Sequence, residues 1–313
     1  MIAQKPKPCS RKLATTDVLG PSVPNAAALE FNGERFTPEC VREIWYEHWH
    51  RYAFARAFAR GKRVLDAACG EGYGSALLAG DAREVLGLDI AEQAIAHASA
   101  RYATLANLRF AQGDCTALAL PDASVDVVVS FETLEHVAAQ EALVAGFARV
   151  LTGDGVLIVS SPDKRAYSDV SGFRNEFHVR ELYREELLAL LGAHFPFVYL
   201  YGQKLLFQSA IWALGTGQGS GIAAATATAT GSDSIKSGLH YDPLYFIAVC
   251  ARQPLNALPE LGLFGDREES VYRHYNHEVR KNIAAGGRIA ELEGELATLR
   301  RELEQRKKTG AEP

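Results

Sequence analysis

Residues 64–74 read VLDAACGEGYG, an apolar run that ends on an acidic residue and continues into a glycine-rich turn. The pattern predicts a β-strand that ends at Asp66, then a tight turn, then a helix. Gly70 and Gly72 carry no Cβ, so they let the backbone turn sharply and approach a ligand closely. Asp66 and Glu71 would repel a pyrophosphate, whereas they would attract a ligand that carries sulfonium and ammonium charges. The stretch therefore indicates a site for a cationic ligand at the end of a strand.

The same alternation of short apolar runs and helical stretches continues along the chain. Val125–Ser130 and Gly155–Ser160 are rich in valine, leucine and isoleucine, as expected of strands buried on both faces of a parallel sheet. This rhythm predicts an α/β, doubly wound sheet that binds ligands beyond the carboxyl ends of its strands. The predicted strands are Arg63–Asp66, Glu84–Asp89, Leu108–Ala111, Val125–Ser130, Gly155–Ser160, Phe197–Tyr201 and Leu244–Ala251. The predicted helices are Pro38–Arg60, which Gly61 closes, Gly74–Ala79, Ala91–Tyr102 and Glu141–Leu151.

Two further carboxylates follow the next two predicted strands. Asp89 ends the second strand about twenty residues beyond the glycines, where an acidic side chain can bind both ribose hydroxyls. Asp114 follows the third strand, where it could accept a hydrogen bond from an adenine amino group. One aspartate alone is more often a loop cap than a ligand. Carboxylates at three successive strand ends, however, predict a single shared site.

Taken together, these motifs resemble those of the class I S-adenosylmethionine-dependent methyltransferases. The resemblance covers roughly residues 60–160 and is carried by DAACGEGYG, GLDI, QGDCTALALPDASVDVVVSFETLEHV and LTGDGVLIVSSP. It implies a Rossmann-like, seven-stranded sheet whose last strand is antiparallel, and S-adenosyl-L-methionine as methyl donor. By the resemblance, Asp66 and the two glycines hold the methionyl part, Asp89 the ribose, Asp114 the adenine, and Phe131 lies near the sulfonium. The whole set of predicted donor-binding residues is Asp66, Ala67, Gly70, Gly72, Asp89, Ile90, Asp114, Cys115 and Phe131.

The predicted fourth strand is followed by ETLEH, residues 132–136. Positions i, i+3 and i+4 of a helical turn share one face, so Glu132, Glu135 and His136 could converge. ExxEH resembles the divalent-metal site of ubiquinone-pathway O-methyltransferases and of small-RNA 3′-end 2′-O-methyltransferases. In the latter a further histidine completes the site, and His178 is the candidate counterpart here. Mg²⁺, Mn²⁺ and Zn²⁺ would all suit such ligands. Two alternatives stay open: a metal-free general base made of His136 with Glu135, and a purely structural role.

A shorter resemblance concerns the methyl acceptor. Residues 33–36, 47–55 and 174–182 are similar to methyltransferases encoded among glycosyltransferases for bacterial surface polysaccharides. This resemblance implies O-methylation of a sugar, nucleotide-sugar or glycan hydroxyl. One alternative is an O-methyltransferase for an aromatic small molecule of the quinone-pathway type. Another is a non-catalytic, methyltransferase-like scaffold, although a scaffold would not need the complete set of donor-binding residues.

Composition shifts divide the chain into segments. We expect a disordered tail over residues 1–28, an N-terminal helical cap over 29–61, and the methyltransferase domain over 62–254. A Gly/Ala/Thr/Ser tract, residues 215–238, predicts a flexible insertion in that domain. The C-terminal extension, residues 255–313, carries a heptad stripe of apolar residues within 288–306: Ile289, Leu292, Leu296, Leu299 and Leu303. The stripe predicts a helix for self-association or partner binding, with a solvated tail as the alternative.

Composition limits the remaining function classes. The net charge of -5 gives no global signature of nucleic-acid binding. The five cysteines include no CxxC pair, and Cys69 and Cys250 lie in apolar runs, which is typical of buried free thiols. The sequence shows no signal peptide and no apolar run of the ~20 residues that a membrane span needs. We therefore expect a cytoplasmic protein.

Overall fold

The structure, a computed structural model, describes most of the chain. The described residues are 43–209, 226–229, 234–256 and 258–310. They belong to two compact units that divide between Phe264 and Gly265, and each unit is described by itself. The predicted disordered tail and the first part of the predicted helical cap lie outside the described residues.

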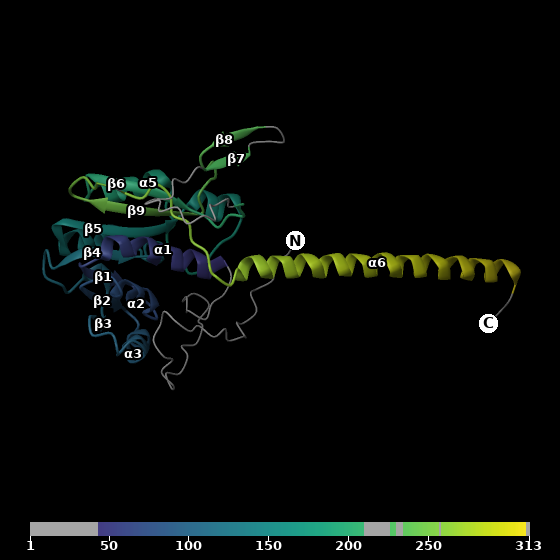
Figure 1. Cartoon of the computed structure of the whole chain (residues 1–313), viewed down its shortest axis with the longest axis horizontal. Coiled ribbons are helices and arrows are strands. Elements are labelled where there is room, and N and C mark those ends of the chain that lie inside the picture. Colours follow the sequence, from purple (N-terminus) through teal and green to yellow (C-terminus); the bar gives the residue numbers. More distant parts are fainter. Residues whose placement is uncertain (1–42, 210–225, 230–233, 257, 311–313) are drawn as a thin grey trace, which may run out of the picture. The chain divides into compact units, whose positions relative to one another are not determined.

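A seven-stranded sheet is the centre of the first unit. Its strand order is β3-β2-β1-β4-β5-β9-β6, and Figure 1 shows the strands stacked in this order. All strands share one direction except β9, which is antiparallel to both of its neighbours. The predicted doubly wound sheet with an antiparallel last strand is confirmed. The strand bounds are β1 Arg63–Ala67, β2 Glu84–Asp89, β3 Leu108–Gln112, β4 Val125–Ser130, β5 Leu151–Pro162, β6 Phe197–Gln203 and β9 Tyr245–Ala251.

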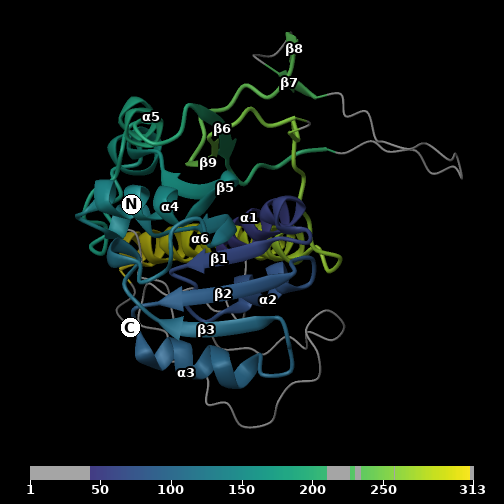
Figure 2. The same cartoon turned by 90° about the vertical axis from the view of Figure 1, so that its left-hand side faces the viewer.

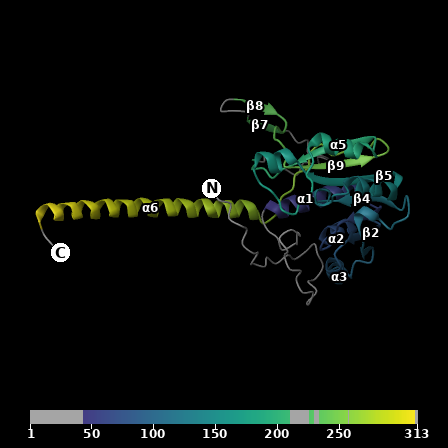
Figure 3. The same ribbon diagram turned by 180° about the vertical axis from the view of Figure 1, so that it is seen from behind.

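Helices cover both faces of this sheet. Side chains of α4 and α5 belong to one buried cluster, and side chains of α1, α2 and α3 belong to the cluster on the other face. Figures 2 and 3 show α2 and α3 near the β2–β3 side of the sheet and α5 near β9 and β6. The helix bounds are α1 Glu43–Ala59, α2 Tyr73–Ala79, α3 Glu92–Arg101, α4 Gln140–Val150 and α5 Arg184–Gly192.

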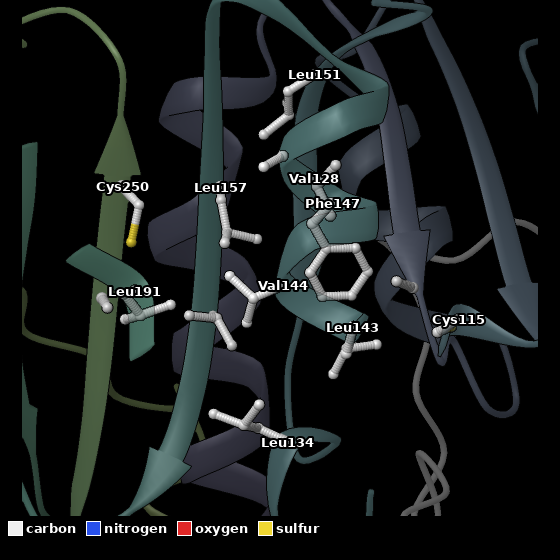
Figure 4. Close-up of a cluster of buried hydrophobic side chains, with 14 of the residues drawn as sticks. Cys115, Val128, Leu134, Leu143, Val144, Phe147, Leu151, Leu157, Leu191 and Cys250 are labelled. Atoms are coloured by element: carbon white, nitrogen blue, oxygen red, sulfur yellow. The ribbon is translucent and has the colours of Figure 1, made fainter. Parts of the chain in front are cut away.

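The larger cluster lies between α4 and the middle of the sheet. Val144 and Phe147 of α4 face Val128 of β4 and Leu157 of β5, and all four are fully buried (Figure 4). Three consecutive apolar residues in β4 and four in β5 are needed because helices cover both faces of these strands. The predicted end of the N-terminal helix is also confirmed, since α1 stops at Ala59 and Gly61 adopts a left-handed conformation with φ 70°.

Within the predicted flexible insertion the structure contains a two-stranded hairpin, β7 Ala227–Ala229 and β8 Ile235–Ser237. Thr228 is 7% exposed, and its hydroxyl donates to the Gly238 carbonyl at 2.8 Å. Alternating Ala and Thr can form a strand because β-branched threonine favours extended backbone. The insertion thus contains regular secondary structure at these residues, its flexibility stays a prediction, and the rest of the tract lies outside the described residues.

The second unit consists mainly of one helix. Helix α6 runs over Ser270–Thr309, 40 residues, so it starts well before the predicted heptad stripe (Figure 1). Its sequence is charged throughout, with a basic last turn of Arg306, Lys307 and Lys308. No helix among the described residues combines the length and the apolar character of a membrane span.

Candidate functional site

The turn between β1 and α2 has an unusual backbone. Ala68, Gly70 and Gly72 all have positive φ, at 62°, 55° and 88°. A Cβ on Gly72 would lie 2.8 Å from the Cβ of Ala98 and from the ring of Phe110. Glycine is therefore required at this position both by conformation and by the close approach of α3 and β3.

Asp89 connects this turn to the next strand. Its Oδ2 accepts the backbone N–H of Gly70 at 2.8 Å, and its Oδ1 accepts that of Ala91 at 2.9 Å. A carboxylate has about four lone-pair sites, so each oxygen can still accept a hydrogen bond from a ligand. Ile90, the next residue, is 68% exposed and offers an apolar surface at the strand end.

Asp114 lies at the neighbouring strand end. The register pairs Asp89 with Gln112, so Asp114 follows only two residues beyond the residue opposite Asp89. Its Oδ1 accepts the backbone N–H of Thr116 at 2.8 Å and the Thr116 hydroxyl at 2.7 Å, which lowers the pKa of Asp114. Cys115 is buried, which raises the pKa of its thiol to about 12. Asp114 therefore presents an exposed, ionised carboxylate above a neutral thiol.

Asp66 differs from the other two aspartates because it points into the protein. It is fully buried, and it accepts hydrogen bonds from Ser75 Oγ at 2.6 Å and Tyr52 Oη at 3.1 Å. Burial raises the pKa of Asp66 to about 7, although both hydrogen bonds oppose the rise. Asp66 thus links β1 to α1 and α2 beneath the glycine turn, and its contact with the methionyl part of a donor stays a prediction.

The remaining predicted donor residues lie beside Asp66. Ala67 is fully buried at the end of β1. Phe131, the first residue after β4, is 6% exposed and packs edge-to-face on Tyr52 with ring centroids 5.1 Å apart. Neither residue is brought out to the surface, so contact between Phe131 and a donor stays a prediction.

Glu71 does not face the predicted ligand. It is 1% exposed, and its carboxylate binds Arg101 at 2.8 Å and His97 at 3.1 Å and accepts from Tyr102 at 3.2 Å. The sequence interpretation that Glu71 would attract a cationic ligand is wrong, because α3 supplies the positive charge that compensates it.

Glu132 lies outside the helical turn of its predicted partners, although it is close enough for its charge to help raise the pKa of Glu135. It adopts φ 49°, and its carboxylate pairs with Arg51 Nη1 at 2.9 Å and accepts from Ser160 Oγ at 3.2 Å. The 3₁₀ turn that carries Glu135 and His136 begins only at Leu134. The predicted convergence of Glu132 with Glu135 and His136 on one helical face is therefore wrong, since Glu132 precedes the helical turn.

The other three predicted residues do come together. Potential ligand atoms of Glu135, His136 and His178 all lie within 4.8 Å of one another. The imidazole rings of His136 and His178 meet edge-to-face at 4.9 Å, and the backbone carbonyl of Glu135 accepts the N–H of Val179 at 2.8 Å. This backbone contact explains how residues more than forty positions apart in sequence become neighbours.

The chemical state of this trio is unusual. Glu135 is fully buried, and neither carboxylate oxygen has a hydrogen-bond partner among the described residues. Burial raises its pKa well above the ordinary value. His136 Nδ1 contacts the Phe177 carbonyl at 3.0 Å and His178 Nδ1 contacts Glu181 at 2.6 Å, which orients both rings. An unsatisfied buried carboxyl beside two oriented imidazoles could hold a divalent cation or pass on a proton.

Comparison with known protein families matches residues 65–159 to the methyltransferase domain family. A probable S-adenosylmethionine-dependent methyltransferase of Mycobacterium tuberculosis is 40% identical over 173 residues, which cover 54% of this chain and 62% of that protein. Residues 65–159 of this chain are therefore similar to a methyltransferase domain.

Two further relatives are more distant. A ubiquinone biosynthesis O-methyltransferase of Idiomarina loihiensis is 36% identical over 123 residues, 38% of this chain and 50% of that protein. The solved structure of the YcgJ protein of Bacillus subtilis aligns at TM-score 0.45 and 25% identity, over 50% of this chain and 71% of that chain. The matches to the curated relatives of Mycobacterium tuberculosis and Mycolicibacterium smegmatis span 62% and 64% of their length, less than two thirds of those proteins.

Sequence reasoning missed the residue that joins α1 to the methyltransferase domain. Arg51 is 1% exposed, pairs with Glu132, and donates from Nε to Gln203 Oε1 at 2.7 Å. Its guanidinium also lies 4.4 Å from the ring centroid of Tyr245. The only hint in the sequence was an arginine within an aromatic helix. Its partners Glu132, Gln203 and Tyr245 are far apart in sequence, and only the fold brings them close to Arg51.

A cavity of about 710 Å³ lies where α1 meets the carboxyl ends of β5 and β6 and the start of β9. None of the predicted donor-binding residues lines it. Burial raises the pKa of Glu47 in its wall to about 7, and Gln203 in the same wall binds Arg51. The lining includes aromatic and charged side chains, among them Tyr46, Glu47, His50, Asp163, Tyr183 and Gln203.

Proposed function

We propose that this chain transfers a methyl group from S-adenosylmethionine to a hydroxyl oxygen of its acceptor. The observation that carries the proposal is the pair of carboxylates, Asp89 and Asp114, at adjacent strand ends beside a turn that requires glycine. Their chemistry fits the donor: Asp89 can accept from the ribose hydroxyls and Asp114 from the adenine amino group, while Ile90 covers the adenine with apolar surface. S-adenosylmethionine supplies a methyl group on a cationic sulfur, which an acceptor oxygen displaces in line.

A hydroxyl acceptor must lose its proton during transfer, and the trio of Glu135, His136 and His178 is suited to this task. Two roles are proposed for it. In the first, His136 takes the proton, and Glu135, whose ionised form is favoured once the neighbouring imidazole is charged, stabilises that charge. In the second, the three side chains hold Mg²⁺, Mn²⁺ or Zn²⁺, which would lower the pKa of the bound hydroxyl.

Exhaustive chelation separates these two roles. If a cation is required, chelation abolishes turnover and one of the three metals restores it, whereas Glu135→Gln removes the restoration. Full turnover in chelator rejects the metal and leaves His136 as the base. A Glu304→Gln variant, at an exposed carboxyl of α6, is the matched control and should behave as the parent.

We propose a sugar, nucleotide-sugar or glycan as the acceptor, in the assembly of a bacterial surface polysaccharide. Residues 47–55 and 174–182 resemble methyltransferases encoded among glycosyltransferases for surface polysaccharides, which supports this acceptor. The cavity of about 710 Å³ also supports it, because its size falls in the range of small-molecule sites. Aromatic rings beside charged side chains suit a sugar, because its ring faces are apolar and its edges carry hydroxyls. A cytoplasmic location is proposed with it, since Cys69, Cys115 and Cys250 are free thiols.

An aromatic hydroxyl is the second candidate acceptor. It is favoured by the LEH turn with its buried glutamate and by the similarity to a ubiquinone biosynthesis O-methyltransferase. The test is release of S-adenosylhomocysteine with two acceptor panels, one of nucleotide sugars and glycan ends and one of catechols and hydroxyquinols. Release with the first panel alone supports the glycan proposal, and release with the second alone replaces it. If no donor binds at millimolar concentration, the domain is a scaffold.

A further inference from the structure

Helix α6 carries an apolar stripe with regular heptad spacing. Taking Ile289 as position a of the heptad abcdefg, the apolar positions a and d are Ile289, Leu292, Leu296, Leu299 and Leu303. These five side chains are between 46% and 63% exposed in the described chain. Exposed leucine and isoleucine on a single stripe are unfavourable in water, so the stripe is expected to be covered.

The charges beside the stripe indicate what covers it. In a parallel, in-register two-stranded coiled coil, each g residue lies next to the e residue of the following heptad on the other chain. The g positions are Arg288, Glu295 and Glu302, and the e positions that they meet are Glu293, Arg300 and Lys307. All three combinations join opposite charges. We infer that α6 pairs with α6 of a second copy of this chain as a parallel, in-register coiled coil.

Other features of α6 agree with two parallel strands. Asn282 occupies the a position one heptad before Ile289, and a buried asparagine at a single a position specifies register and favours dimers. Gly294 falls at the outward f position, where no partner chain needs a side chain. In an antiparallel pair that overlaps the whole stripe, by contrast, g faces g and e faces e, so Glu293 with Arg300 would attract but Glu295 with Glu302 would repel.

The ion pairs within α6 do not prevent this arrangement. Arg288 pairs with Glu291 at 2.9 Å and Lys307 with Glu304 at 3.3 Å, and all four side chains are at least 60% exposed. Exposed pairs three residues apart on a helix contribute only about 0.2–0.5 kcal/mol. They can therefore exchange with pairs between chains at little cost. The stripe covers about three heptads, so we expect a dimer that dissociates on dilution.

The experiment is the mass of the full-length chain by light scattering across a dilution series. The expected result is twice the 34.0 kDa of one chain at the highest concentration, falling toward 34.0 kDa on dilution. Glu295→Lys with Glu302→Lys places like charges at the g–e contacts and should give 34.0 kDa throughout. The matched control, Glu291→Lys with Glu304→Lys, makes the same charge change at outward positions and should keep the parent's mass.

A second pair of variants tests the contacts directly. Arg300→Glu with Lys307→Glu should also be monomeric alone, yet a mixture with the Glu295→Lys, Glu302→Lys chain should return to the doubled mass. Orientation is read from Arg306→Cys, because only parallel, in-register helices bring these two thiols together, and the oxidative cross-link is scored against the parent chain treated in the same way. The inference is overturned if the parent stays at 34.0 kDa at every concentration. Retention of the doubled mass by Glu295→Lys with Glu302→Lys, or failure of the cysteine variant to cross-link, overturns it equally.

Discussion

At the scale of single residues, three carboxyl groups lose contact with water to different degrees: Asp66 and Glu135 are fully buried, and Glu47 is half-buried in the cavity wall. Burial raises the pKa of Asp66 and Glu47 to about 7 and that of Glu135 well above its ordinary value. Each of these groups keeps its proton in the folded chain over a pH range in which the unfolded chain has released it. Folding therefore takes up protons in that range, and the free energy of unfolding falls as pH rises.

Asp66 allows this effect to be measured. Its pKa rises from 3.8 to about 7, so the stability of the ligand-free chain should decrease between about pH 4 and pH 7. The loss cannot exceed about 1.4 kcal/mol for each pKa unit of the shift. Asp66→Asn, which can still accept from Ser75, should flatten the decline in urea unfolding, and Asp122→Asn at an exposed carboxyl should not. If Asp66→Asn leaves the decline of stability with pH unchanged, the raised pKa of Asp66 is contradicted.

Among the residues of α1 whose contacts are described, Arg51 is the one whose removal should lower the free energy of unfolding most. Breaking a buried ion pair typically costs about 3–5 kcal/mol because the remaining charge is left without a partner. Glu132 is 22% exposed, so water can replace part of the interaction, and we expect about 2–3 kcal/mol for Arg51→Ala. Arg273→Ala, in an exposed pair with Glu268, should change stability by less than about 1 kcal/mol. If Arg51→Ala and Arg273→Ala lose the same amount of stability, Arg51 does not form a buried ion pair.

At the scale of elements, the close approach of α1 to α2 depends on a glycine. A Cβ on Gly74 would lie 2.0 Å from the ring of Tyr52, although its backbone is helical. Gly74→Ala should therefore destabilise the fold by about 1–3 kcal/mol through overpacking. Gly192 in α5 has nothing within 4 Å of its Cβ position, so Gly192→Ala should be neutral or stabilising by about 0.4–1 kcal/mol. Thermal unfolding of the two variants in parallel checks this, and a reversed order would refute the packing of Tyr52 on α2.

The elements also show what the sequence could predict. Buried strands such as β4 can be predicted from sequence, because both of their faces are covered and their residues are therefore almost continuously apolar. The positions of Asp89 and Asp114 follow from the same rule, since parallel strands end at one edge. Helix α5 and the hairpin of β7 and β8 were not predicted, because short elements with weak periodicity form only in the context of the fold.

Side-chain direction was harder to predict than position. Glu71 lies in the expected turn, yet its side chain points to Arg101 of α3, a partner that the sequence of the turn does not indicate. Glu132 fits the i, i+3, i+4 spacing, but its left-handed backbone places it outside the helical turn. Both errors have one cause: spacing along the chain fixes a face only where the backbone is regular.

At the scale of the whole molecule, the methyltransferase domain and α6 have separate tasks in this account. We propose that the domain binds the donor at the carboxyl edge of its sheet and that α6 joins two chains. The two proposals fail independently, because the charge reversals on α6 leave Asp89 and Asp114 unchanged and the loss of Asp89 leaves the heptad stripe intact. Donor affinity should accordingly be the same for the parent and for the Glu295→Lys, Glu302→Lys chain.

The most direct test of the central claim is the calorimetric affinity for S-adenosylmethionine of the parent, Asp89→Ala and Asp122→Ala. We predict that the parent binds and that Asp89→Ala loses about 1–3 kcal/mol, the value of charge-assisted hydrogen bonds, while Asp122→Ala binds as the parent does. Thermal unfolding of Asp89→Ala without donor distinguishes lost affinity from lost folding. Unchanged affinity in a folded Asp89→Ala chain would contradict the placement of the donor at this edge of the sheet.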